Sequence, residues 1–504
     1  MVRSLSNKGK MAFMNYRNLL LCTVLLAGLS LQTVAQDETD ALRYSYLSPM
    51  GTARSMGFGS ALGSIGGDFT SLSVNPAGIG VYRSSEFTFT PGLRMNSTSG
   101  SYMNSTQDDN NVRLVVNNIG YVHTHNNGDR SKWSTVSWGV GMTRLADYNR
   151  DYRYSGQNSG LTSSSYSELF ALDANSPNGN PSDPTTLGGM ANSAGLISYD
   201  SAHSQYHTNV PWMAGIDQGR IVKERGATNE IVISLGGNYM EKLLLGATIG
   251  IPIINYSRDA SVTESALTPT TDFASYTYSE SLRTHGNGIN LKLGMIYKVN
   301  DNFRIGAAIH TPTYYSMHDD YTTTLNNQGA SQSYSNTNLY DYGMTTPWRG
   351  ILSAAVIVGK RGFITADYEY VNYGTAKFNF DASNSGAESA VNSLIASSYQ
   401  PGSIFRIGGE VKVTDFFMLR AGLGYYSNPY KSDSLSISTN RIDISGGVGF
   451  HFDRMFIDLA FQHSQYTNPE QFYVLQYSSI PTIAPTASIN NSLNTAAITI
   501  GFKL

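Results

Sequence analysis

Polar and apolar residues alternate at every second position through most of the chain from Ser85 onward. This period places successive side chains on opposite faces of a β-strand. In FRIGGEVKV (405–413) the odd positions are apolar or glycine, whereas Arg406 and Glu410 are among the even ones. The segments GFITADYEY (362–370) and RIDISGGVGFHF (441–452) share the pattern. The sequence therefore predicts an all-β protein whose strands have one apolar and one polar face.

Loop lengths distinguish a membrane barrel from a soluble sandwich, which would also alternate. Membrane barrels have strands of about 9 to 11 residues, with short turns on one side and long loops on the other. Short turns are expected at 240–242, 299–302, 359–361, 414–415 and 453. Long polar loops are expected at 149–228, 258–275, 314–335, 375–402, 427–440 and 467–493. We therefore predict an antiparallel transmembrane β-barrel of about 14 strands, with residues 276–299 and 336–358 each open to interpretation as two shorter strands.

The amino terminus has the features of a secretory signal peptide over residues 1–35. Arg17 precedes an apolar run at 19–31, and Thr33-Val34-Ala35 ends it. The run is shorter than the roughly 20 residues that span a bilayer, although a membrane anchor is the alternative. The only cysteine, Cys22, lies in this leader, so the mature chain has no disulfide or cysteine metal site.

Overall composition excludes two further classes of protein. A mean hydropathy of -0.23 does not fit a bundle of apolar transmembrane helices, and a net charge of -3 gives no indication of nucleic-acid binding. Export without disulfides indicates a bacterial envelope, and we expect the outer membrane of a Gram-negative bacterium.

A glycine-rich stretch, residues 41–82, separates the leader from the strands. Gly is permissive in its backbone angles, and Asn75-Pro76 disfavours helix at the Asn and fixes a turn. This composition suits short helical turns packed closely inside another structure. We predict that residues 36–84 form a helical hatch, or plug, inside a barrel made by residues 85–504 with long extracellular loops.

Several segments, in order along the mature chain, resemble the FadL/TodX family of outer-membrane transporters for long-chain fatty acids and other hydrophobic compounds. They are GTARSMGFGSALGSIGGD, SLSVNPAGIG, GVGMTRLADYNRDY, LLLGATIGIPIINY, TPWRGILSAAVIVGKRGFITADYEYVNYG and RIGGEVKVTDFFMLRAGLGYYSNPY. The predicted strand count agrees with the family's fourteen. The chain is most similar to Bacteroidetes-type members, some of which carry the label hemin receptor.

The resemblance implies a hatch-plugged barrel, a hydrophobic pocket in its lumen and passive diffusion of the cargo. The family's hatch motif maps onto Asn75, Pro76 and Ala77. The family also implies lateral exit at a kinked third strand, which corresponds to residues 133–148. Gly139 and Gly141 share one face there and are the candidates for the opening. Continuous pairing of that strand with both neighbours would count against an opening.

Apolar hatch side chains are candidate ligand contacts, because a water-insoluble solute needs apolar surface where a lumen is otherwise polar. The candidates are Met50, Met56, Phe58 and Leu62, and Arg54 is added because Arg binds carboxylates. The alternative is that these side chains form the hatch's own core. Arginines on the lumen faces (Arg406, Arg420 and Arg441) are expected to pair with Asp367, Glu369, Glu410 or Asp443.

The long loop 149–228 contains apolar islands that include Leu169, Phe170, Trp212 and Met213. Long loops without strand pattern tend to be functional, so these side chains are candidates for a groove that first catches the ligand. Packing of the loop against itself is the alternative, which we favour.

The function expected from the sequence is passive uptake of hydrophobic small molecules, such as fatty acids, by a monomeric channel without cofactor or metal. Its partners would be the ligand, outer-membrane lipid and the barrel-assembly machinery. Two alternatives stay open: a hemin-binding receptor, since the chain has nine histidines, and a structural or adhesive barrel, since the loops are rich in Asn, Ser and Thr. No GxSxG elbow is present, and no enzymatic activity is expected.

Overall fold

The computed structural model describes residues 37–128, 131–159, 164–177, 179–269, 273–328, 333–431, 439–477, 480–483 and 486–504. The predicted signal peptide, residues 1–35, lies outside the described residues.

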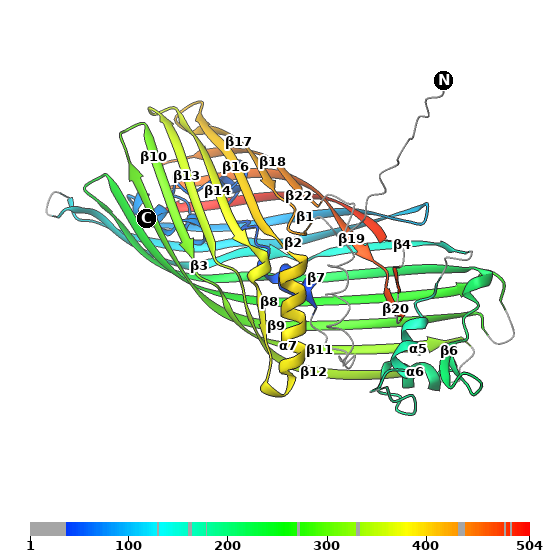
Figure 1. The fold of residues 1–504 in the computed structure, drawn as a ribbon. Coiled ribbons are helices and arrows are strands. Elements are labelled where there is room, and N and C mark those ends of the chain that lie inside the picture. The colour runs from blue at the N-terminus through cyan, green and yellow to red at the C-terminus, as the bar shows by residue number, and fades with distance from the viewer. Residues whose placement is uncertain are drawn as a thin grey trace, which may run out of the picture.

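One closed antiparallel sheet forms the wall of a barrel (Figure 1). In the described residues it contains β1 (Glu86–Tyr102), β2 (Ser105–Asn126), β3 (Trp133–Asp147), β4 (Arg150–Asn158), β7 (Ile216–Tyr239), β8 (Leu243–Ala266), β9 (Ser275–Lys298), β10 (Phe303–His310), β11 (Tyr314–Asn327), β12 (Tyr334–Thr345), β13 (Arg349–Val358), β14 (Gly362–Asn372), β15 (Lys377–Asn379), β16 (Pro401–Lys412), β17 (Phe417–Tyr426), β18 (Arg441–His451), β19 (Met455–Gln471) and β22 (Thr486–Lys503). The last strand pairs with the first, from Glu86↔Lys503 to Ser101↔Ser488, so the sheet has no open edge where it closes.

The predicted number of strands is confirmed. Four wall strands are each built from two successive segments, namely β3 with β4, β10 with β11, β12 with β13, and β14 with β15, which gives a 14-stranded barrel. The interruption expected in residues 336–358 is real, because Pro347 lies between β12 and β13. Residues 276–299 instead form the single strand β9.

Helices and small sheets lie inside the barrel or at its long-loop end (Figure 1). The helices are α2 (Glu38–Ser45), α3 (Ala53–Gly57), α4 (Ser71–Val74), η1 (Pro76–Val81), α5 (Glu168–Ala174), α6 (Leu187–Ser193), η3 (Trp212–Ala214), η4 (Tyr373–Thr375), η5 (Ala382–Asn384) and α7 (Ser385–Ser398). The hairpins β5 (Ile197–Asp200) with β6 (Gln205–Thr208) and β20 (Val474–Tyr477) with β21 (Ile480–Ile483) complete the fold. No helix of the described residues is long and apolar enough to cross a membrane.

The two faces of the wall carry the predicted side chains. On β16, Phe405 and Ile407 face outward and are about half exposed, whereas Arg406 between them is buried in the lumen. The outer band continues around the barrel, with Ile233 on β7 and Leu352 on β13 among its exposed apolar side chains. An apolar outside and a polar inside are what a strand needs between lipid and a lumen.

Part of the wall extends far beyond the membrane, which corrects several predicted loops. β7, β8 and β9 have 24 residues each, whereas β17 has 10. The ranges 258–275 and 314–335 were expected to be loops, but the first contains the end of β8 and the second contains all of β11. These ends carry polar side chains on both faces, and Thr322 and Thr337 bond across two strands. Because their outward side chains are polar, these ends lack the apolar outer face by which a membrane strand is recognised in the sequence.

Residues 37–82 run through the lumen. α3 contacts β17, β18, β19 and β22. On the opposite side of the lumen, η1 contacts β3, β7, β8 and β9. The segment therefore crosses the barrel from wall to wall, and Figure 1 shows it in blue inside the strands. We call residues 37–84 the hatch.

Candidate functional site

Inward-facing glycines of the wall create the space that the hatch fills. A β-carbon added to Gly120 would overlap the ring of Phe69, and one added to Gly141 would lie 2.5 Å from the same ring. One at Gly139 would lie 3.0 Å from Leu72. These two β3 glycines therefore provide close approach to the hatch.

Pairing is continuous on both sides of β3 at these glycines. Gly139 pairs with Val122 of β2 and Ser234 of β7. Gly141 likewise pairs with Gly120 of β2 and Val232 of β7. The wall is closed there, so Gly139 and Gly141 do not line an opening.

The Asn-Pro-Ala motif joins the hatch to itself and to the wall. The fully buried Asn75 accepts a hydrogen bond on Oδ1 from the Ala77 N–H at 3.1 Å, which caps η1. Its Nδ2 donates to the carbonyl of Gly63 at 2.6 Å and to that of Met295 on β9 at 3.2 Å. Gly294 leaves room for this side chain, since a β-carbon there would overlap Asn75 Oδ1. The motif thus holds two hatch turns against one wall strand.

Three of the five hatch ligand candidates are fully buried between hatch and wall. Phe58 and Leu62 pack with Ile351 and Phe363, and Met56 packs with Ala460 and neighbouring alanines. These three side chains therefore fill the contact between the hatch and the wall.

Arg54 and the lumen arginines make ion pairs. Arg54 Nε lies 3.0 Å from Glu410 Oε2, and Arg420 Nε lies 2.6 Å from the same oxygen. The other pairs are Arg406 with Glu369 at 2.9 Å, Arg441 with Asp443 at 2.7 Å and Arg420 with Asp458 at 2.6 Å. Their charges are already matched inside the barrel.

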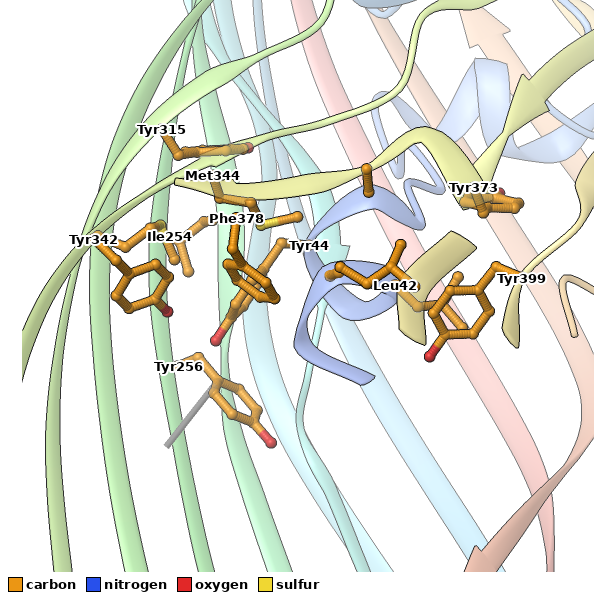
Figure 2. Packing of buried hydrophobic residues seen from close by; sticks show 14 of the residues in the cluster. Leu42, Tyr44, Ile254, Tyr256, Tyr315, Tyr342, Met344, Tyr373, Phe378 and Tyr399 are labelled. Carbon is orange, nitrogen blue, oxygen red and sulfur yellow. The ribbon is translucent and has the colours of Figure 1, made fainter. Parts of the chain in front are cut away.

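A cluster of buried aromatic and apolar side chains surrounds α2, the first helix of the hatch, toward the long-loop end (Figure 2). We call this cluster the aromatic chamber. Figure 2 shows Leu42 and Tyr44 of α2 among side chains from β8, β11, β12, η4 and β15, with Tyr399 directly after α7. The buried residues around α2 are Ile254, Tyr256, Leu282, Tyr315, Met317, Tyr342, Met344, Val371, Tyr373, Ala376, Phe378, Ile395 and Tyr399. Tyr44 meets Tyr256 edge to face, with ring centroids 6.1 Å apart. Apolar rings and flexible Met side chains are what a pocket for hydrophobic molecules is made of.

The sequence did not reveal this chamber, because six of its thirteen residues outside α2 lie in segments expected to be loops. Tyr315 and Met317 lie on β11, and Phe378 lies on β15. The only signal was a local one: within YYSMH the buried Tyr315 and Met317 are two apart, with the exposed Tyr314 before them.

Backbone pairing between β2 and β3 covers only part of their length. The β2–β3 ladder runs from Asn126↔Thr135 to Asn118↔Thr143 and ends there. β3 stays paired with β7 as far as Asp147↔Ala227, and β4 continues from Arg150↔Glu224. Among the described residues no ladder joins β2 to β4. A gap in the backbone pairing, which we call the wall gap, therefore lies between residues 112–117 and 144–149.

β2 has a β-bulge beside the wall gap, and β4 is displaced toward the lumen. The β1–β2 register shifts between Thr90 and Pro91, so Asn117 is an extra residue on β2. Further out, Thr98 of β1 donates its hydroxyl to the Asp151 carbonyl at 2.6 Å, which places β4 over the inner face of β1. On the outer side of the gap, Val112 and Leu114 are 61% and 85% exposed.

The hatch covers the wall gap from inside. The N–H groups of Ser48 and Met50 donate to the carbonyls of Leu145 and Arg144 at 2.8 Å and 3.0 Å. Beyond the end of the β2–β3 ladder, the hatch backbone thus donates hydrogen bonds to carbonyl groups of β3 in place of β2. Among the five ligand candidates, Met50 is thus the one that bonds to β3 at the wall gap.

The long loop packs on itself and on the strand ends. Phe170 is fully buried against Tyr276 and Tyr278, Leu169 packs on another cluster, and Trp212 is partly buried. Met213 is 73% exposed. The buried Glu264 of β8 anchors the loop by accepting from Ser165, from the Tyr166 N–H and from Tyr276. The four groove candidates are therefore not brought together in one groove.

Within the described residues, no group of three His, Cys, Asp or Glu side chains is placed to hold a metal ion. His310 bonds the Val74 carbonyl of the hatch at 2.8 Å, and the exposed His203 bonds Asp200.

Comparison with known proteins agrees with the resemblance. Residues 233–480 match the family described as outer membrane protein transport protein (OMPP1/FadL/TodX). A search of curated proteins finds no match. Among solved structures, a Pseudomonas aeruginosa FadL homologue is 12% identical, with a TM-score of 0.57, over 91% of this chain and 99% of that one. The Pseudomonas putida toluene transporter TodX is 13% identical, with a TM-score of 0.51, over 90% and 98%.

These findings define an outer-membrane β-barrel protein of a Gram-negative bacterium with the fold of a hydrophobic-compound channel. The resemblance to the FadL/TodX family is confirmed by the matched region and by the fold.

Proposed function

We propose that this protein is a passive channel that takes up hydrophobic small molecules, such as long-chain fatty acids, and releases them sideways through the wall gap. The observation that carries this proposal is the end of the β2–β3 ladder at Asn118↔Thr143, with hatch residues bonded to the freed β3 edge. A solved structure similar to this chain is described as a toluene transporter. That description supports a hydrophobic cargo.

The route follows the apolar surfaces in the lumen. Leu42 and Tyr44 of α2 fill the centre of the aromatic chamber in this structure. The chamber therefore receives the cargo only when α2 moves out of it. The hatch blocks the straight path to the short-turn end, with Asn75 and Pro76 holding it against the wall. Movement of residues 48–50 then opens the wall gap toward Val112 and Leu114, which face lipid. Cargo on this route stays out of bulk water.

Flux of a hydrophobic fluorescent probe into liposomes tests the proposal. Protein-containing vesicles are expected to fill faster than empty vesicles, and equal rates would favour a structural barrel without transport.

A proline at position 50 probes the seal over the wall gap. Met50→Pro removes the N–H that donates to Arg144, whereas the matched Met50→Leu keeps it. We expect faster flux with Met50→Pro than with Met50→Leu. Equal flux of the two variants would show that the wall gap is not the exit.

A further inference from the structure

A groove of about 460 Å³ lies on the outer face of the wall, across β9, β10, β13 and β14. Its sides are apolar side chains of the outer band. Leu293, Leu352 and Tyr370 are among them, at 46%, 61% and 45% exposure. We call it the outer groove. Because its lining side chains point away from the lumen, it is separate from the route proposed for the cargo.

Two small residues form the floor of the outer groove. Gly350 of β13 pairs with Ile309 of β10, and Ala307 of β10 pairs with Leu352 of β13. Gly350 and Ala307 are therefore diagonal neighbours on one face of the sheet. Among the described residues, no atom beyond the chain neighbours of Gly350 lies within 4 Å of a β-carbon added to it. The larger side chains around these two positions leave a hollow over them.

The outer groove lies in the long-loop half of the apolar band. Trp348, just before β13, is 56% exposed, and Tyr314, at the start of β11, is 61% exposed. Trp and Tyr concentrate where a bilayer meets water. In the other direction, β13 continues through the exposed Val356 and Val358 to a short turn. Long loops of bacterial barrels are extracellular, so the groove faces the outer leaflet.

Hydrocarbon surrounds the outer band, so the occupant of the groove has to be apolar. The volume is about 15 times the roughly 30 Å³ that one water takes in the liquid. An empty hollow of that size would deprive its lining of dispersion contacts. The acyl chains of the bilayer are present at this depth, and they are narrow and flexible enough to enter.

A second copy of the chain fits the groove less well than an acyl chain does. A stable protein interface buries about 1,000 Å² or more with close complementarity. Ile309, Leu352 and Tyr370 are all exposed around the floor, so another barrel wall would meet these side chains before it reached Gly350.

We infer that the outer groove binds one acyl chain of an outer-leaflet lipid, seated over Ala307 and Gly350. The same two strands hold the hatch on their inner face, where Ala308 and Ile351 pack with Phe58 and Leu62. Lipid and hatch thus support one layer of the wall from opposite sides. The inference requires that the wall lies in the membrane, but it does not require transport.

A photoreactive lipid tests the inference on the full-length protein in phosphatidylcholine vesicles. The probe is a trace of phosphatidylcholine with a diazirine on one saturated chain. After irradiation, the label is counted in peptides from β13 and from β17, per exposed apolar side chain. β17 is the reference because Leu419 and Leu423 are 45% and 52% exposed in the same band.

The variants fill the groove in two steps. Gly350→Ala adds one carbon and Gly350→Leu adds a full side chain, both into open space. Ala421→Leu, at an exposed position on the outer face of β17, is the matched control. If the leucine lowers the yield of folded protein, the alanine variant still provides the comparison.

We expect more label on β13 than on β17 in the wild-type protein. Gly350→Leu should lower the β13 label to the β17 level, with Gly350→Ala in between, and Ala421→Leu should leave the excess on β13 unchanged. Equal labelling of the two strands in the wild-type protein, or an excess on β13 that survives both substitutions at Gly350, would overturn the site.

Two further measurements separate this site from its rivals. A β13 label that falls as more protein is added per vesicle would assign the groove to a second copy of the chain and would overturn the lipid site. Flux of a hydrophobic probe into the same vesicles reports on the channel alone. Loss of the β13 excess with flux intact would refute the lipid site, whereas absent flux with the excess intact would refute the channel.

Discussion

Replacing Asn75 with Ala should release the hatch from the wall without unfolding the barrel. The change removes the cap on the Ala77 N–H, a contribution of about 0.5–2 kcal/mol. It also leaves the buried Gly63 carbonyl without its amide donor, which costs about 1–3 kcal/mol. The sum is roughly 1.5–5 kcal/mol, so the equilibrium for local opening of the hatch should rise about 10- to 4,000-fold.

Hydrogen exchange followed by mass spectrometry measures this opening directly. Peptides within residues 52–81 should exchange faster in Asn75→Ala, while a wall peptide such as 229–239 keeps its wild-type rate. Asn490→Ala is the control, because Asn490 is exposed and its side chain bonds only Thr467 on the neighbouring strand. Unchanged exchange in the hatch, or a loss of protection throughout the barrel, would refute this reasoning.

Three further predictions concern the hatch, its pH dependence and the lipid-facing wall. Gly294→Ala should reproduce the exchange of Asn75→Ala, because the added β-carbon overlaps Asn75 Oδ1; wild-type protection would contradict this. Burial and the neighbouring Asp37 raise the pKa of Glu38 on α2 to about 7, so α2 should be held best below about pH 4.5 and less firmly as the pH rises through 7. Protection factors of α2, corrected for intrinsic exchange, should fall between about pH 4.5 and pH 7 in the wild-type protein and should not depend on pH in Glu38→Gln. Protection factors that do not change with pH in the wild-type protein would exclude a role of Glu38 in holding α2. Ile233→Arg, in the outer apolar band, should lower the free energy of unfolding in vesicles, measured with urea, by about 2–4 kcal/mol. Thr263→Arg, on the extended part of β8, should change this free energy little, and equal effects of the two variants would show that the band does not mark the membrane.

The sequence predicted the barrel well where one face of each strand meets lipid. Alternation is visible only when apolar and polar faces differ, as they do at Phe405 and Arg406. The strand extensions beyond the membrane face water on their outer side, so their sequence lacks the apolar outer face of the membrane strands. For the same reason the chamber lined by Tyr315 and Phe378 could not be placed.

The candidate site was predicted less completely because its contacts join parts of the chain that are far apart. Gly139 and Gly141 were recognisable as unusual in a strand, but only the fold shows that they accommodate Phe69 and Leu72. The wall gap depends on where one ladder ends, and no residue type marks that position in the sequence. The lumen ion pairs were easier to predict, since a buried charge needs an opposite one nearby.

Photo-crosslinking with a hydrophobic diazirine probe during uptake tests the central claim most directly, because it marks the path of the cargo on the protein. If the cargo follows the proposed route, the probe should label peptides from the chamber, including residues 42–44 and 342–344. It should also label both edges of the wall gap, at residues 112–117 and 144–147. Labelling confined to the outer band, with the lumen and the gap unmarked, would contradict transport through this barrel.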